Sequence, residues 1–392
     1  MHQSMALAKG ARITGGMFCL LFFLFTACWL VVDLGEFGIG GLWESWTFQH
    51  SGGTNQVTTP FHVGLALVQL AAVFTAFAGQ RVAGGLLAVA TTFTFATALQ
   101  AVISTGSHTS DERWFLHAEN ATTTFDGVFV SSLGVLLLSF AAGVVLLTGV
   151  RSWPREKPSD PPVRPTRTAG TVAGLLLGAM VLANLAWQIY LLTQGGGSFT
   201  TFYLGKGVLS SLLCLAPGWS ALVFLVLTAL AGVNSLMRGG AARGLAIGLA
   251  VLSLPSALVV LIALAGNGAL FTLNDGTPGL SILNDLQLLL DLLGSPALLA
   301  LMARGEPVAV AWYPPSRAPQ FAGPGFVPPP GPQAPPAWQP PAGPVPPVSG
   351  PPMPPAGPVP PVSGPPMPPA GAPPVPPGNP PAPQGGFGPP RY

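Results

Sequence analysis

The sequence predicts an all-α, polytopic integral membrane protein: a bundle of eight transmembrane helices followed by a disordered, proline-rich C-terminal tail. Of its 392 residues, 49% are hydrophobic and 7% are charged, whereas soluble domains are about a quarter charged. Eight apolar stretches each approach the ~20 residues that a helix needs to cross a hydrocarbon core of ~30 Å. Residues 313–392 hold 35 of the 46 prolines, and a segment of this composition cannot bury a core.

The eight apolar stretches are residues 13–32, 61–79, 82–103, 128–149, 171–192, 207–232, 244–265 and 282–303. All are expected to be α-helices, because lipid offers unpaired backbone N–H and C=O groups no hydrogen-bond partners. The first stretch follows Lys9 and Arg12, in the order of charge and apolar run that a signal peptide has. It is longer than the ~7–15-residue core of a signal peptide, so we expect a spanning helix.

Two further features lie in and after the first stretch. Phe25-Thr26-Ala27-Cys28 is an imperfect bacterial lipobox, which would make Cys28 a lipidation site. The chain continues apolar after Cys28, which favours the spanning helix. In the loop that follows, residues 42–48 are rich in Trp and Phe, which prefer the level of the lipid headgroups. These residues predict a short interfacial helix.

The basic residues predict the orientation, because cytoplasmic loops carry an excess of Lys and Arg. With the N-terminus inside, only Arg113 and Lys206 of the 15 basic residues fall outside. The other 13 are Lys9, Arg12, Arg81, Arg151, Arg155, Lys157, Arg164, Arg167, Arg238, Arg243, Arg304, Arg317 and Arg391. We therefore expect a plasma-membrane protein with both termini in the cytoplasm. Arg far outnumbers Lys, and Ala, Gly and Pro are abundant, which is typical of a bacterial protein.

Residues 151–168 divide the membrane region into two halves. Five prolines in this segment exclude a regular helix. The expected regions are a first four-span half at 1–150, a basic cytoplasmic linker at 151–168, a second four-span half at 169–304 and the tail at 305–392. Residues 75–79 (TAFAG) and 228–232 (TALAG) end corresponding spans in the two halves. This pattern predicts a 4+4 repeat whose halves run in parallel.

Polar residues in the last apolar stretch are the strongest candidates for a functional site. They are Asn284, Gln287, Asp291 and Ser295, which fall within about 80° of arc on a helix. Asp291 lies roughly 20 Å along that helix from Arg304, where a carboxylate is costly and is expected to face the bundle interior or a cavity. It would serve as a proton or cation site. The alternative is a structural role, with Asp291 protonated or paired with Asn184 and Gln188 of the fifth span.

Prolines are predicted to interrupt the last three spans, at Pro217-Gly218, Pro255 and Pro296. Broken helices in transporters free backbone carbonyls to line a substrate site. The alternative is a kink whose freed groups are satisfied by neighbouring helices.

Four histidines are expected on the outer side of the first half: His50, His62, His108 and His117. Glu44, Asp111, Glu112 and Glu119 lie in the same loops, and imidazole with carboxylate suits zinc or copper. The spacings match no metal motif, and the alternative is solvated loop histidines that titrate near neutral pH.

Glycines recur at every fourth residue in two places and predict close helix packing, within the bundle or between copies in a homo-oligomer. They are Gly170, Gly174 and Gly178 in the fifth span, and Gly240, Gly244 and Gly248 at the seventh.

Three functions fit these observations. The first is a non-enzymatic membrane protein whose proline-rich tail binds cytoplasmic partners that recognise polyproline II; a tail without a specific ligand fits equally. The second is a proton- or cation-coupled small-molecule transporter, and the third is an outer-face metal-binding protein or enzyme. No nucleotide-binding or hydrolase motif predicts a cofactor. The net charge of +2 and the lack of a basic patch with aromatics exclude nucleic acid as a partner.

Overall fold

The computed structural model describes residues 4–47, 49, 56–107, 114–115, 123–153, 163–194, 199–273 and 278–307. The chain divides into two units, Met1–Ser316 and Arg317–Tyr392. The first contains every described helix. The second lies outside the described residues. Of the predicted tail, 305–392, only residues 305–307 are described, and Glu306–Pro307 form a short strand.

The described part of the chain contains eight long helices. They are α1 (Lys9–Trp46), α2 (Pro60–Phe77), α3 (Ala83–Gly106), α4 (Thr123–Gly149), α5 (Arg167–Gln194), α6 (Pro217–Leu236), α7 (Ala242–Gly266) and α8 (Pro278–Ala303). Each is long and apolar enough to cross a membrane. The prediction of a mostly helical chain with eight helices that could each cross a membrane is therefore confirmed.

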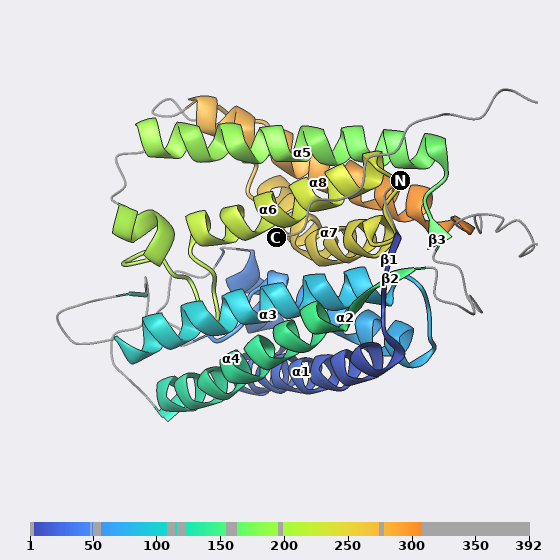
Figure 1. Cartoon of the computed structure of the whole chain (residues 1–392). Coiled ribbons are helices and arrows are strands. Elements are labelled where there is room, and N and C mark those ends of the chain that lie inside the picture. Colours follow the sequence, from blue (N-terminus) through green and yellow to red (C-terminus); the bar gives the residue numbers. More distant parts are fainter. Residues whose placement is uncertain are drawn as a thin grey trace, which may run out of the picture. The chain divides into compact units, whose positions relative to one another are not determined.

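The eight helices pack as two groups of four with the same order of contacts (Figure 1). In the first group, α1 and α3 each pack against both α2 and α4. In the second group, α5 and α7 each pack against both α6 and α8. Helix α7 also packs against α2 and α3, so it joins the two groups.

Glycines let the helices approach closely at this junction. A Cβ added to Gly244 of α7 would lie 2.8 Å from the Cα of Gly85 in α3. A Cβ on Gly64 of α2 would collide with the backbone carbonyl of Leu252 in α7. The backbones of α2, α3 and α7 therefore touch directly, which is how small residues favour helix association in an apolar solvent.

Two short antiparallel strand pairs lie at one end of the bundle. β1 (Ser4–Leu7) pairs with β2 (Val150–Trp153), and β3 (Val163–Arg164) pairs with β4 (Glu306–Pro307). Both ends of the predicted linker are thus extended strands, and its last two residues already belong to α5. Residues 154–162 lie outside the described part.

Arginines connect helix ends at the same end of the bundle. Arg12 donates to the carbonyl of Gly79 at 3.2 Å, which ties the start of α1 to the end of α2. Arg238 donates to the carbonyl of Pro165 at 3.1 Å and forms a 2.7 Å ion pair with Glu306. Arg243 donates to the carbonyls of Met302 and Ala303, at 2.9 and 2.8 Å. The Arg243 contacts satisfy the last carbonyls of α8, as basic side chains commonly do at the C-terminus of a helix.

The first predicted span, residues 13–32, is too short. Helix α1 has 38 residues and contains one backbone break, at Gly38, where φ is 66°. The residues predicted as a separate interfacial helix continue α1 beyond that break as far as Trp46. Cys28, the candidate lipidation site, lies exposed within α1.

For the sixth span, predicted at residues 207–232, the predicted first residue is wrong. Helix α6 starts at Pro217, and Ala216 before it is extended, with ψ 143°. A residue that precedes proline is driven out of the helical region, and proline itself favours the first helical turn. Pro217 therefore begins the helix and does not interrupt it. Pro255 and Pro296 do lie inside helices, in α7 and α8.

Residues 207–216 form a non-helical, partly buried segment after the π-helix η1 (Thr200–Leu204). Leu209, Leu212 and Leu213 in this segment are at most 1% exposed. The backbone N–H groups of Leu212 and Leu213 donate to the carbonyls of Gln56 and Val57, both at 3.0 Å. Backbone N–H groups in this stretch thus find hydrogen-bond partners outside a helix. The stretch is as apolar as a membrane span but is not helical.

The glycine junction generates a prediction about stability. Gly244→Leu is expected to destabilise the protein by about 1–3 kcal/mol, because the new side chain must push α3 and α7 apart. The measurement is the thermal unfolding midpoint of the detergent-purified protein. Gly178→Leu is the matched control, since a Cβ at Gly178 would meet nothing within 4 Å. Equal midpoints for the two variants would contradict a close contact at Gly244.

Candidate functional site

A cavity of about 840 Å³ lies among α5, α6, α7 and α8, with α2 at its border. At one end its wall contains Thr59, Leu215, Pro217 and Thr272, which lie where α2 and α6 begin and just beyond the end of α7. Its deeper part reaches Asp291, in the second half of α8. The volume lies within the range of small-molecule binding pockets, about 300–1,000 Å³.

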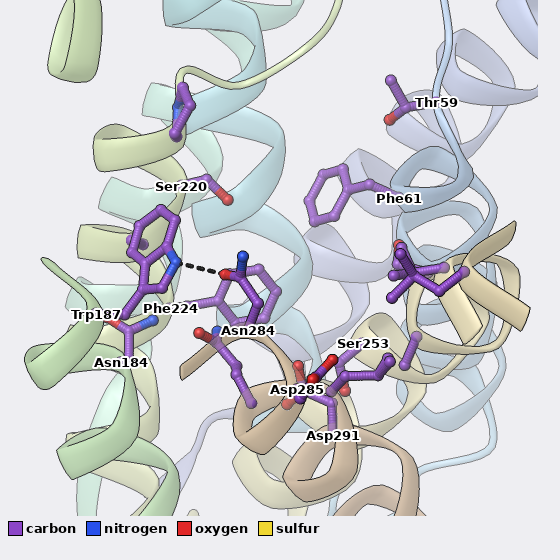
Figure 2. A pocket seen from close by; sticks show the side chains of 18 of the residues that line it. Thr59, Phe61, Asn184, Trp187, Ser220, Phe224, Ser253, Asn284, Asp285 and Asp291 are labelled. Carbon is purple, nitrogen blue, oxygen red and sulfur yellow. Dashed lines mark hydrogen bonds between the residues drawn. The ribbon is translucent and has the colours of Figure 1, made fainter. Parts of the chain in front are cut away.

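Three aromatic side chains from three helices border the cavity: Phe61 of α2, Trp187 of α5 and Phe224 of α6. Figure 2 shows them around the polar residues of α8. The rings of Phe61 and Phe224 pack together, with centroids 6.3 Å apart. The indole Nε1 of Trp187 donates to Asn284 Oδ1 at 2.7 Å, which anchors the indole at the cavity wall.

Two carboxylates of α8, Asp285 and Asp291, line the same cavity. Its described lining includes no Lys, Arg or His. Within the described part of the chain, the Asp291 carboxylate has neither a hydrogen bond nor an ion pair. The cavity therefore concentrates negative charge and places no cation of the protein beside it.

The deeper part of the cavity continues into a smaller pocket of about 70 Å³. Asn184, Ser253, Gln287 and Asp291 line both spaces. Four helices, α5 to α8, contribute to this inner pocket. Asp291 thus lies where all four helices of the second group meet.

The structure brings most of the predicted polar residues together. Asn284, Gln287, Asp291 and Asn184 line the cavity. Ser295 instead is fully buried and lies with its Oγ 2.9 Å from Oγ of Ser253.

The two amides of α5 bond to each other. Gln188 donates to Asn184 Oδ1 at 2.7 Å, and Tyr203 donates to Gln188 Oε1 at 3.5 Å. Neither amide pairs with Asp291 within the described residues. Two other residues of the predicted polar face do form hydrogen bonds between helices, Asn284 with Trp187 and Ser295 with Ser253, so a structural role for this face stays a prediction.

Of the four predicted metal-binding histidines, only His62 is among the described residues; His50, His108 and His117 lie outside them. His62 is buried, and its Nδ1 accepts the backbone N–H of Thr59 at 3.0 Å, so it caps the first turn of α2. The described residues contain no group of three or more His, Cys, Asp or Glu that could hold a metal.

The predicted packing glycines differ in their surroundings. A Cβ on Gly170 would lie 2.7 Å from the carbonyl of Ser235, and one on Gly174 would lie 2.5 Å from Leu236, so both face α6. A Cβ on Gly248 would lie 3.0 Å from Val89 of α3. Gly240 lies in the turn before α7.

Sequence reasoning missed two acidic residues. Asp285 is adjacent to Asn284 in the sequence but lies off the predicted polar face. A carboxylate within an apolar stretch is the sequence feature that could have indicated it as a site residue. Asp33 directly follows the first apolar stretch, residues 13–32, where the sequence predicts a loop, but it is fully buried in α1. Its carboxylate accepts the N–H groups of Val57 and Thr58 at 3.0 and 2.7 Å, and the Thr58 hydroxyl at 2.5 Å. Nothing local in the sequence indicates these partners, which lie some two dozen residues away.

A series of hydrogen bonds to backbone groups links Asp33 to the wall of the cavity. It holds Val57 and Thr58, and Val57 in turn accepts the N–H of Leu213. Cys214 and Leu215, directly after Leu213, line the cavity. Asp33 is therefore a positioning residue for one wall of the cavity.

No family model, curated protein or solved structure matches the chain.

The Asp33 contacts generate a prediction. Asp33→Ala leaves two buried backbone N–H groups without an acceptor, at a cost of about 1–3 kcal/mol for each group. The thermal unfolding midpoint in detergent is therefore expected to fall. The midpoint of Asp33→Asn, which keeps one carbonyl acceptor, is expected to fall less. Asp126→Ala, at an exposed position in the first turn of α4, serves as the control. A midpoint for Asp33→Ala equal to that control would refute the role of the carboxylate.

Proposed function

We propose that the protein is a non-enzymatic, multi-pass carrier of small molecules, coupled to protons or another cation, with Asp291 as the coupling residue. The proposal rests on one observation: the Asp291 carboxylate lines a cavity of about 840 Å³ and has no partner in the described part of the chain. An acid inside a membrane-spanning segment that faces a cavity is a typical element of ion and proton pathways.

The energetics of an unpaired carboxylate support coupling. An ionised carboxylate is costly in an apolar layer unless it is hydrated, protonated or bound to a cation. Asp291 has open space before it, so its charge can be neutralised by a species that enters the cavity. Arrival and departure of a proton or cation then change the free energy of the surrounding helices, which is the requirement for coupled transport.

Irregular backbone around the cavity also supports a carrier. Residues 207–216 are non-helical within the bundle, and Cys214 and Leu215 of that segment line the cavity. Non-helical backbone at membrane depth occurs where it is buried in protein or lines a water-filled space. Pro255 in α7 removes one helical hydrogen bond next to Ser253 and Ser256, which also line the cavity.

The helix contacts support a 4+4 parallel repeat, because the α1–α2, α2–α3, α3–α4 and α1–α4 contacts of the first group recur as α5–α6, α6–α7, α7–α8 and α5–α8 in the second. In this arrangement the second group carries the substrate cavity. The first group supports it through α2, α3 and the residues around Thr58.

The positions of the arginines support the predicted orientation. Arg12, Arg238 and Arg243 bind helix ends near the two strand pairs. With this basic end in the cytoplasm, both termini of the membrane region are cytoplasmic and the cavity extends toward the outside of the plasma membrane.

The proposed partner-binding tail concerns residues outside those described, and this hypothesis stays a prediction. The same holds for a homo-oligomer.

The orientation is tested with single cysteines in a variant that lacks the three native ones. Intact cells are treated with a membrane-impermeant maleimide. Asn267→Cys, beyond the end of α7, is expected to react, and Gln80→Cys, in the turn between α2 and α3, is expected to react only after the cells are opened. Both positions are exposed. The reverse pattern of labelling would show the opposite orientation.

The carrier function is tested with purified protein in liposomes under an imposed proton or Na⁺ gradient. Four labelled probes represent the charge classes: choline, glutamine, succinate and sucrose. Wild type is expected to accumulate at least one probe. The uptake rate of that probe is expected to be at least ~10-fold lower in Asp291→Asn, because asparagine cannot ionise. Asp126→Asn, outside the cavity, is the control that keeps the rate. The proposal fails if no probe accumulates, or if Asp291→Asn transports as wild type does.

A further inference from the structure

We infer that the cavity binds an organic cation: a substituted ammonium compound whose charge lies near Asp285 and Asp291 and whose apolar groups contact Trp187 and Phe224. This inference names the substrate class of the proposed carrier and rests on that function for its physiological meaning. Four features of the cavity support it.

The first feature is the sign of the charge. Asp285 and Asp291 both line the cavity, and its described lining contributes no basic side chain. A low-dielectric cleft with charges of one sign concentrates ions of the opposite sign. An anionic substrate would be repelled by both carboxylates, whereas a cation would supply the partner that Asp291 lacks among the described residues.

The second feature is the aromatic wall. Trp187, Phe224 and Phe61 come from three different helices and surround the polar residues of α8 (Figure 2). The faces of aromatic rings attract ammonium groups, and tryptophan attracts them most strongly. The bond from Trp187 to Asn284 and the packing of Phe224 on Phe61 hold these rings in place before a ligand arrives.

The third feature is the Asn184 amide, whose oxygen has a hydrogen-bond partner in the described part of the chain and whose NH₂ group has none. The Asn184 side chain is 6% exposed and lines both the cavity and its inner pocket. Its oxygen accepts from Gln188, but its NH₂ group has no acceptor within the described part of the chain. Because Asn184 lines the cavity, this NH₂ group can donate to a hydroxyl or carbonyl oxygen that a ligand carries next to its ammonium group.

The fourth feature is size and composition. A volume of about 840 Å³ exceeds the space that a bare metal ion needs. Inorganic cations such as Ca²⁺ are held by about 6–8 converging oxygens, and apolar rings contribute nothing to such a shell. A wall that combines carboxylates with aromatic rings matches an ion that carries its own apolar groups.

The test is equilibrium binding of labelled choline to the full-length, detergent-purified protein. Choline is permanently charged, carries a hydroxyl group and has a neutral isostere, 3,3-dimethyl-1-butanol. We expect saturable choline binding that neither the isostere nor succinate displaces. Asp285→Asn and Asp291→Asn are each expected to weaken binding about tenfold or more, and Asp126→Asn is expected to leave it unchanged.

The aromatic contribution has its own pair of variants. Trp187→Leu is expected to weaken choline binding about tenfold, and Trp187→Phe is expected to restore most of the affinity, because phenylalanine keeps a ring face for the cation. Both variants lose the bond to Asn284, so a difference between them reports on the ring and not on the hydrogen bond. Equal affinities for the two would overturn the aromatic contact.

Several outcomes would overturn the organic-cation site. These are displacement of choline by its neutral isostere, unchanged choline affinity in both aspartate variants, and saturable binding of labelled Na⁺ without binding of choline. If liposomes accumulate glutamine or succinate while choline does not bind, the substrate class is wrong and the carrier function stands. If choline binds but no probe accumulates, the site is supported and the carrier function is wrong.

Discussion

The close contact of α7 with α2 and α3 is the interaction on which the rest of the structure depends. One face of α7 carries Gly244, Gly248 and Leu252, which lie against the first group of helices. The opposite face carries Ser253, Ser256 and Ala257, which line the cavity. In an apolar solvent no hydrophobic force drives helices together, so packing of small residues and interhelical hydrogen bonds must do so. The glycines of α7 thereby position the cavity wall.

The two aspartates Asp33 and Asp291 show how the surroundings decide the role of the same side chain. Both lie in apolar helices, where a carboxylate is costly without a partner. Asp33 is fully buried and accepts three hydrogen bonds, so its role is structural. Asp291 lines an open space and accepts none from the described residues. The difference lies in tertiary structure, and it is the reason that Asp291, and not Asp33, carries the proposed chemistry.

The segment 207–216 connects the stability of the fold to the geometry of the site. Its backbone pairs with Gln56 and Val57 of the first group, and its side chains Cys214 and Leu215 face the cavity. The Asp33 carboxylate binds the neighbouring backbone at Val57 and Thr58. A buried polar contact in the first group therefore positions one wall of the cavity in the second. This arrangement connects the two groups of four helices at one wall of the cavity.

The sequence by itself determined the class of fold, because spanning helices need only length and low polarity, and both are local properties. It also determined Asp291 as the leading candidate, since a carboxylate in the middle of an apolar helix is conspicuous without any structure. Tertiary structure decided the features that depend on contacts between residues distant in the sequence. Residues 207–216 are as apolar as a span, yet Pro217 and their hydrogen bonds to distant backbone keep them out of a helix. Likewise, only the packing of α5 and α6 against α8 brings Trp187 and Phe224 to the cavity that Asp291 lines, because side chains distant in sequence meet only when the helices that carry them are placed.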